Sequence, residues 1–144
     1  SYFEGLEGLK KLYADLLTSS TEIKAFLGTV NLDARTKDFL NNVFLPARVK
    51  AKISAKVLVP DSEHLTKDYA AHHKSAKNQK KLLTETRTIH GQSFMLSNEI
   101  DIYGGNKVAV MLYNEGESSG FIIESKSLHD SLASIFDLLW DTST

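Results

Sequence analysis

The stretch Glu99–Trp140, EIDIYGGNKVAVMLYNEGESSGFIIESKSLHDSLASIFDLLW, decides the fold class of this chain. Apolar and polar residues alternate up to position 103, and Gly104-Gly105 supplies the positive φ angles of a tight hairpin turn. Two further apolar segments, 107–113 and 120–124, predict strands that continue as an antiparallel meander. Helical spacing then predicts a closing amphipathic helix. Its expected buried residues are Leu128, Leu132, Ile135, Phe136 and Leu139.

The preceding residues alternate between helical and strand patterns. A helix capped by Asn31 or Asp33 is expected to kink or restart at Pro46, because proline lacks a backbone donor. Alternation of helices with strands predicts parallel pairing through right-handed crossovers. The predicted elements are a helix over 2–17, a strand over 23–30, a helix ending near 52, a strand over 54–59, a helix from 61 to about 80, and strands over 83–89 and 94–103.

The whole chain is therefore predicted to form one α/β domain, residues 1–144. Its sheet is expected to be mixed, with a parallel front half, an antiparallel C-terminal meander and helices on both faces. The chain begins at Ser1 without a methionine. We expect that it is a domain of a longer protein.

Composition narrows the class of function. The 144 residues carry a net charge of −1, which gives no general attraction to nucleic acid or acidic membranes. There is no cysteine, so thiol catalysis, disulfides and thiolate metal sites are excluded. No apolar segment approaches the roughly 18 residues of a membrane span, and the N-terminal residues do not resemble a signal peptide. A cytoplasmic location is expected.

The polar helix predicted from position 61 onward carries two groups of residues that could bind a ligand. The first group, at i, i+4 and i+8, is His64, Asp68 and His72. Its histidines lie about 12 Å apart by the helix rise, so we predict no metal site and no cofactor. The second group is Lys74, Lys77, Lys80 and Lys81. Lysines at a helix end complement the helix dipole, and this explains them without nucleic acid.

Four residues are candidates for binding a small molecule. Glu99 and Asp101 stand two apart on a predicted strand, so both point to the same face. They could bind a hydroxylated ligand or act as acid and base, or they could simply face water. Arg48 and Arg87 carry the donor fork that recognises anionic or sugar-like ligands, although ordinary surface ion pairs are the more common explanation for such arginines.

Four segments of the chain resemble one family. They are FEGLEGLKKLYADLL, LPARVKAKISAKVLVPD, NEIDIYGGNKVAVM and GFIIESKSLHDSLASIFDLLW. Together they resemble the effector domain of TrmB-like transcriptional regulators. The resemblance implies a fold similar to the phospholipase D superfamily, a small-molecule effector such as a sugar, and a homodimer. It also implies that DNA is bound only through a winged helix-turn-helix domain, which would precede Ser1.

The resemblance also implies where an active site would lie. Phospholipase D enzymes use HxKxxxxD on the strand that leads into the hairpin. The corresponding residues here include Ser97, Glu99 and Gly104, and the stretch contains neither histidine nor lysine. We therefore predict no catalytic residues and no phosphodiesterase activity.

The sequence leads to one main hypothesis and two alternatives. The main hypothesis is a ligand-sensing and dimerisation domain of a TrmB-like regulator. The first alternative is a hydrolase-like α/β enzyme that uses Glu99 and Asp101. The second is a purely protein-interaction module, in which the apolar stripe of the first helix would contact a partner copy.

Overall fold

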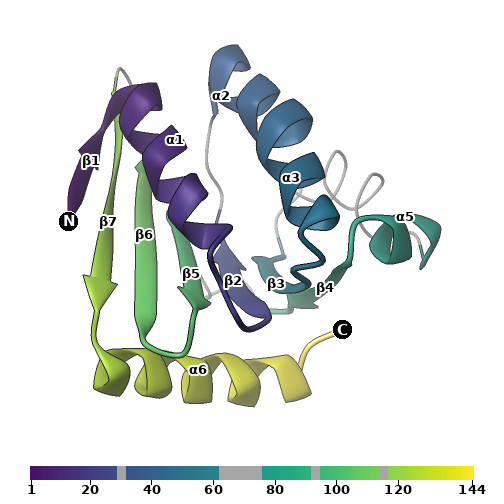
Figure 1. Ribbon diagram of the computed structural model, residues 1–144. Coiled ribbons are helices and arrows are strands. Elements are labelled where there is room, and N and C mark those ends of the chain that lie inside the picture. Colours follow the sequence, from purple (N-terminus) through teal and green to yellow (C-terminus); the bar gives the residue numbers. More distant parts are fainter. Residues whose placement is uncertain (29–31, 62–75, 92–94, 114–116) are drawn as a thin grey trace.

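The protein forms a single seven-stranded sheet between two layers of helices (Figure 1). The computed structural model describes all residues except 29–31, 62–75, 92–94 and 114–116. The described strands are β1 (Tyr2–Glu4), β2 (Ile23–Leu27), β3 (Ala55–Pro60), β4 (Thr84–Ile89), β5 (Glu99–Tyr103), β6 (Lys107–Tyr113) and β7 (Ser118–Glu124). The described helices are α1 (Gly5–Leu16), α2 (Ala34–Phe39), the π-helix η1 (Leu40–Phe44), α3 (Leu45–Lys50), α5 (Ala76–Lys81) and α6 (Lys126–Asp141).

The sheet is mixed, as the sequence predicts. Its strand order is β1-β7-β6-β5-β2-β3-β4. The neighbours β2, β3 and β4 are parallel, whereas every other neighbouring pair is antiparallel. The junction lies between β2 and β5, where Ala25 is opposite Asp101 and Leu27 is opposite Glu99. This register places the predicted site residues of β5 next to the C-terminal half of β2.

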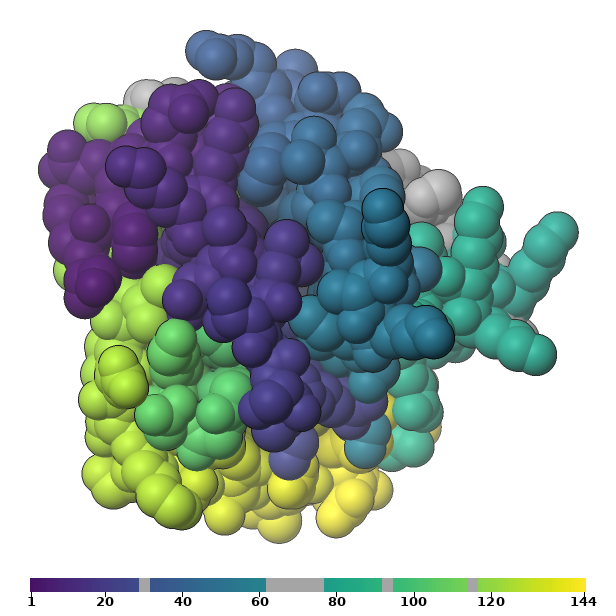
Figure 2. All heavy atoms as spheres, viewed as in Figure 1, coloured from purple at the N-terminus to yellow at the C-terminus, as the bar shows by residue number. Residues whose placement is uncertain are grey.

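Helices cover the two faces of the sheet separately. Helices α1, α2 and α3 lie on one face, and α6 lies on the other (Figure 1). Figure 2 shows α1 and the α2–α3 segment side by side over the first face. The first core contains buried residues of α1 packed on β2, β3, β5 and β6, whereas the second joins Phe26, Leu58 and Ile102 to Phe136 and Trp140 of α6. The apolar stripe of α1 thus packs on the sheet of its own chain. It is not an exposed surface that could contact a partner copy.

The closing helix differs from the prediction in its exposed residues. Phe136 is fully buried, and Leu132 and Leu139 pack against the second core. Ile135, however, is 49% exposed, and Trp140 is buried instead. The apolar stripe therefore tilts across the helix, because the twisted sheet meets only part of a helix of 16 residues.

The N-terminal residues also differ from the prediction. The helix expected over 2–17 begins only at Gly5, whose φ of +64° ends a short strand. That strand, β1, pairs antiparallel with β7 and places Tyr2 opposite Phe121. The pairing partner lies more than 100 residues away, so local periodicity could not reveal it.

The second predicted helix is confirmed, with the interruption expected near Pro46. Asp33 caps α2, since its Oδ1 accepts a hydrogen bond of 2.7 Å from the backbone N of Thr36. The π-helical turn Leu40–Phe44 follows, and α3 starts immediately before Pro46. In this π-helical turn the backbone hydrogen bonds span five residues instead of four. The longer turn accommodates the missing N–H donor and the ring of Pro46. Asn31, the alternative cap, lies outside the described residues.

Strand β5 is shorter than the predicted strand over 94–103. The backbone N of Gly28 donates to the carbonyl of Asn98 at 2.9 Å. A Cβ at Gly28 would lie 2.5 Å from the carbonyl oxygen of Leu96, so only glycine permits this close approach. The chain thus crosses the end of β2 before it enters the sheet at Glu99.

Two predicted groups fall wholly or partly outside the described residues. His64, Asp68, His72 and Lys74 all lie in the segment 62–75. The remaining lysines, Lys77, Lys80 and Lys81, are exposed on α5, which protrudes beside β4 in Figure 2. In the described part of the chain, no helix is long and apolar enough to cross a membrane.

Candidate functional site

Glu99 and Asp101 lie on the face of β5 that α1 and the α2–α3 segment cover. Asp101 is only 3% exposed, so the alternative that both carboxylates simply face water is wrong for it. Its cross-strand neighbours are Ala25 on β2 and Ala109 on β6. Alanine on both sides leaves room for a carboxyl group within an otherwise apolar layer.

Two tyrosines complete this cluster, and sequence analysis missed both. Tyr13 of α1 donates a hydrogen bond to Glu99 Oε1 at 3.1 Å. Its hydroxyl also lies 2.6 Å from the hydroxyl of Tyr113 on β6. Tyr13 belongs to the apolar stripe of its helix, and nothing in the sequence links positions 13, 99 and 113. We call Tyr13, Glu99, Asp101 and Tyr113 the acid cluster.

Burial controls the protonation of the acid cluster. Burial raises the pKa of Asp101 well above its usual value, and the neighbouring Glu99 raises it further, whereas Arg48 opposes the shift. Burial also raises the pKa of Glu99, against the effect of its hydrogen bonds to Asp101 and Tyr13. The charged form of a carboxyl group loses solvation inside a protein, so a raised pKa is the expected response.

Arg48 is buried on the same face and holds secondary structure together. Its guanidinium donates to the carbonyl of Ile53 at 2.8 Å, to the carbonyl of Leu82 at 3.2 Å and to Thr84 Oγ1 at 2.6 Å. These contacts join α3 to the residues that precede β3 and β4. Arg48 therefore contributes positive charge toward Asp101 while its hydrogen bonds serve the fold.

Arg87 lies on the opposite face of the sheet. Its Nη1 donates to the carbonyl of Trp140 at 2.9 Å, and its guanidinium carbon lies 4.4 Å from the centre of the Trp140 ring. A longer ion pair of 3.6 Å joins it to Glu85. The structure thus brings Arg48, Glu99 and Asp101 into one layer and places Arg87 against α6.

A polar contact at the carboxyl ends of β3 and β4 was not predicted. His90 Nδ1 lies 3.1 Å from Asp61 Oδ2, and His90 Nε2 lies 2.6 Å from Thr144 Oγ1. The backbone N of Thr144 also donates to the carbonyl of Thr88 at 3.3 Å. All three side chains are exposed, and together they hold residues after α6 against the sheet.

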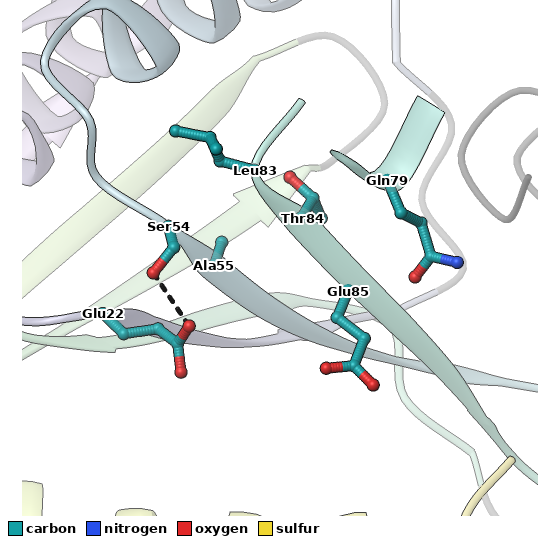
Figure 3. A pocket seen from close by; sticks show the side chains of 7 residues that line it. All are labelled: Glu22, Ser54, Ala55, Gln79, Leu83, Thr84 and Glu85. Atoms are coloured by element: carbon teal, nitrogen blue, oxygen red, sulfur yellow. Dashed lines mark hydrogen bonds between the residues drawn. The ribbon is translucent and has the colours of Figure 1, made fainter. Parts of the chain in front are cut away.

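A cavity of about 450 Å³ opens at the amino ends of β2, β3 and β4 (Figure 3). Its lining residues are Glu22, Ser54, Ala55, Gln79, Leu83, Thr84 and Glu85. Ser54 donates to Glu22 at 2.8 Å across its wall. Glu99 starts β5 beside the opposite end of β2, so no predicted site residue lines this cavity.

The described residues offer no built metal site. Within 1–28, 32–61, 76–91, 95–113 and 117–144, no group of three histidine or acidic side chains converges on one point. At the positions that the sequence resemblance assigns to the phospholipase D motif, Ser97 is exposed, Glu99 begins β5 and Gly104 forms the hairpin turn. These side chains supply neither a nucleophilic imidazole nor a cation for a phosphate.

Comparisons with known proteins establish the fold. No family model and no curated protein matches the chain. Among solved structures, TrmBL2, an archaeal chromatin protein that binds DNA, matches 99% of the chain with a TM-score of 0.63 and 14% identity. The chain spans 52% of TrmBL2.

Two bacterial proteins match over nearly their full lengths. NucT from Helicobacter pylori matches all of this chain and 99% of its own, with a TM-score of 0.66 and 8% identity. Nuc from Salmonella typhimurium, a phospholipase D family member, matches all of this chain and 95% of its own, with a TM-score of 0.65 and 13% identity. At these sequence identities the similarity concerns the fold. The chain therefore has the phospholipase D-like fold.

Proposed function

We propose that this domain senses a small molecule and mediates dimerisation in a TrmB-like transcriptional regulator, without catalytic activity. In this proposal it acts in the cytoplasm, and a DNA-binding domain elsewhere in the full protein contacts DNA. The effector is a hydroxylated, sugar-like molecule. The proposed binding residues are Arg48, Glu99 and Asp101, which lie on one face of the sheet. Arg87, predicted together with them, lies against α6 on the other face and is left out of this site.

The observation that carries this proposal is the replacement of charge in the motif strand. Where phospholipase D enzymes present a lysine to phosphate, this chain has Glu99. A carboxylate at that position repels a phosphodiester instead of holding it. The fold is thus kept while the cation and the nucleophile of the enzymes are replaced. The similarity to TrmBL2 over 99% of the chain supports a role in regulation.

A thermal-shift screen of sugars, polyols and other metabolites tests the sensing role. A ligand that binds only the folded protein adds about 2.7 kcal/mol of stability at a concentration of 100 Kd. We expect the Tm to rise with one class of hydroxylated compound and the rise to shrink in Asp101→Asn. The control Asp141→Asn removes an exposed carboxylate from α6 and should keep the full shift. If no compound raises the Tm, the sensing role is wrong.

Light scattering of the same samples tests dimerisation. A dimer that persists at micromolar concentration supports the proposal, and its stability should change when the effector is bound. A domain that stays monomeric with and without effector contradicts the dimerisation role.

The absence of phosphodiesterase activity can be measured directly. Purified protein incubated with bis(p-nitrophenyl) phosphate should release no more nitrophenol than buffer does, because positions 97, 99 and 104 offer neither a histidine nucleophile nor a cation that would hold the phosphate. Glu99→Gln serves as the matched variant. Hydrolysis by the wild type that disappears in Glu99→Gln would show that the protein is an enzyme.

The raised pKa of Asp101 favours the second candidate function, an acid–base enzyme. Perturbed carboxyl groups gather at active sites, where one must hold a proton near neutral pH. Such an enzyme would convert a compound found in the screen above. A screening hit that is consumed over time, with loss of turnover in Asp101→Asn, would favour catalysis over sensing.

A further inference from the structure

The acid cluster joins three elements of the sheet and its covering layer. Tyr13 comes from the middle of α1, Glu99 and Asp101 from β5, and Tyr113 from the end of β6. The ring of Tyr13 also packs on Phe44, with ring centres 4.7 Å apart. Tyr13 is thus one of two residues of α1, with Asp15, that make polar contacts with the sheet.

Glu99 and Asp101 stand two residues apart on β5 and point to the same covered face, where Asp101 is buried and Glu99 is half-buried. Two ionised carboxylates in this position would repel each other, because each can only accept a hydrogen bond. Tyr13 has one proton and donates it to Glu99, so the short contact of 2.6 Å uses the proton of Tyr113. Neither tyrosine can then supply a proton to Asp101. A proton held by one of the two carboxyl groups would remove their repulsion.

We propose that Glu99 and Asp101 share one proton in the folded protein at neutral pH, and that its loss at higher pH weakens the contact between α1 and the sheet. Two negative charges would then face each other in a buried layer where only limited water can solvate them. The pair is thus a pH-sensitive element built into the fold. This inference rests on the geometry of the cluster and stands whether or not an effector binds there.

Other charged groups near the pair do not replace this proton. From α3, Arg48 offers positive charge to Asp101, but its hydrogen bonds go to Ile53, Leu82 and Thr84. On the same strand, Tyr103 donates to Asp15 of α1 at 2.7 Å.

The remaining neighbours add little charge to this layer. The ammonium group of Lys107 on β6 lies 3.0 Å from the carboxylate of Asp15, and the two charges neutralise each other. From β2, the residues opposite the pair are Ala25 and Leu27, and from α2 it is Phe39 that packs on Tyr13. Among the described neighbours, Arg48 is thus the cation that competes with the shared proton.

The direction of the pH effect follows from the raised pKa values. The folded protein binds the proton more tightly than the unfolded chain does, where the two carboxyl groups titrate near 4. The stability that the proton provides is therefore complete below about pH 4. It is lost as the pH rises through the higher pKa of the folded pair.

Thermal unfolding of wild type and Asp101→Asn between about pH 5 and pH 8.5 tests the proposal. The amide of asparagine donates to Glu99 and so imitates the shared proton at every pH. We expect the Tm of the wild type to fall across this range more steeply than that of Asp101→Asn, and the variant to be the more stable protein at high pH. Glu85→Gln, an exposed carboxylate on β4, should keep the wild-type slope.

Two further measurements separate this element from a general loss of stability. Hydrogen-exchange protection, corrected for the intrinsic rate, should fall with pH in α1 and stay constant in α6. Carbon-detected NMR of the wild type should show one carboxyl group of the pair still protonated at pH 7. Glu99→Gln, which can donate to Asp101, replaces Asp101→Asn if the latter does not fold.

Three results would overturn the proposal. In the first, the Tm of Asp101→Asn has the same pH slope as that of the wild type. In the second, both carboxyl groups titrate near 4, which means that Arg48 holds Asp101 in the ionised form. In the third, protection in α1 and α6 falls together, which shows that the pH effect is not confined to the contact at Tyr13.

Discussion

Replacement of Phe136 by alanine should destabilise the domain by about 3–5 kcal/mol, the usual cost of removing a buried aromatic side chain. Phe136 is 0% exposed and lies at the centre of the α6 core. Its ring meets Phe26 edge-on, with centres 5.2 Å apart, and stacks on Trp140 at 5.6 Å. Alanine would leave a cavity between two aromatic rings that belong to different elements.

Urea unfolding followed by Trp140 fluorescence measures this loss. The matched control is Leu138→Ala on the same helix, because Leu138 is 70% exposed. We expect this control to change the free energy of unfolding by less than about 0.5 kcal/mol. Equal losses in the two variants would mean that α6 does not pack on the sheet through Phe136.

Replacement of Arg48 by methionine should cost about 3–5 kcal/mol, the range found when one partner of a buried charged network is removed. The substitution removes the Arg48 donor from the carbonyl of Ile53 and from Thr84 Oγ1. The carbonyl of Leu82 also loses Arg48 but keeps the hydrogen bond from Thr84 Oγ1. It also removes the positive charge that lowers the pKa of Asp101. Methionine fills a similar volume, so lost hydrogen bonds and charge explain the effect more than lost packing does.

Denaturant unfolding of Arg48→Met and Arg48→Lys checks this prediction. Lysine keeps the positive charge but lacks the planar fork of donors with which the guanidinium reaches three acceptors. It should therefore restore only part of the stability. Arg35→Met on the exposed surface of α2 is the control and should unfold like the wild type. A full recovery in Arg48→Lys would contradict the role of the guanidinium geometry.

Much of the antiparallel half could be predicted from local sequence. The strand Lys107–Tyr113 has the predicted bounds, because Gly104 and Gly105 adopt the positive φ angles that the hairpin requires. The interruption near Pro46 was likewise predictable from a single missing donor. Such features depend on neighbours within a few residues, and the sequence contains those neighbours.

The candidate site was only partly predictable. Spacing placed Glu99 and Asp101 on one face of a strand, and this is confirmed. Nothing in the spacing could show that Asp101 is buried, because its burial depends on α1 and on Ala25 and Ala109 from other strands. Spacing also could not show that Arg48 and Arg87 lie on opposite faces of the sheet, because their positions depend on contacts with distant residues.

The sequence by itself determined the mixed α/β class, the hairpin at Gly104-Gly105 and the absence of histidine and lysine from residues 94–104. Tertiary structure alone decided that β1 pairs with β7 and that Tyr13 meets Glu99, 86 positions later in the chain. Turn geometry and hydrophobic period are local properties of the chain. The protonation of a carboxyl group depends on burial and on charges brought from distant segments, and only the folded molecule assembles them.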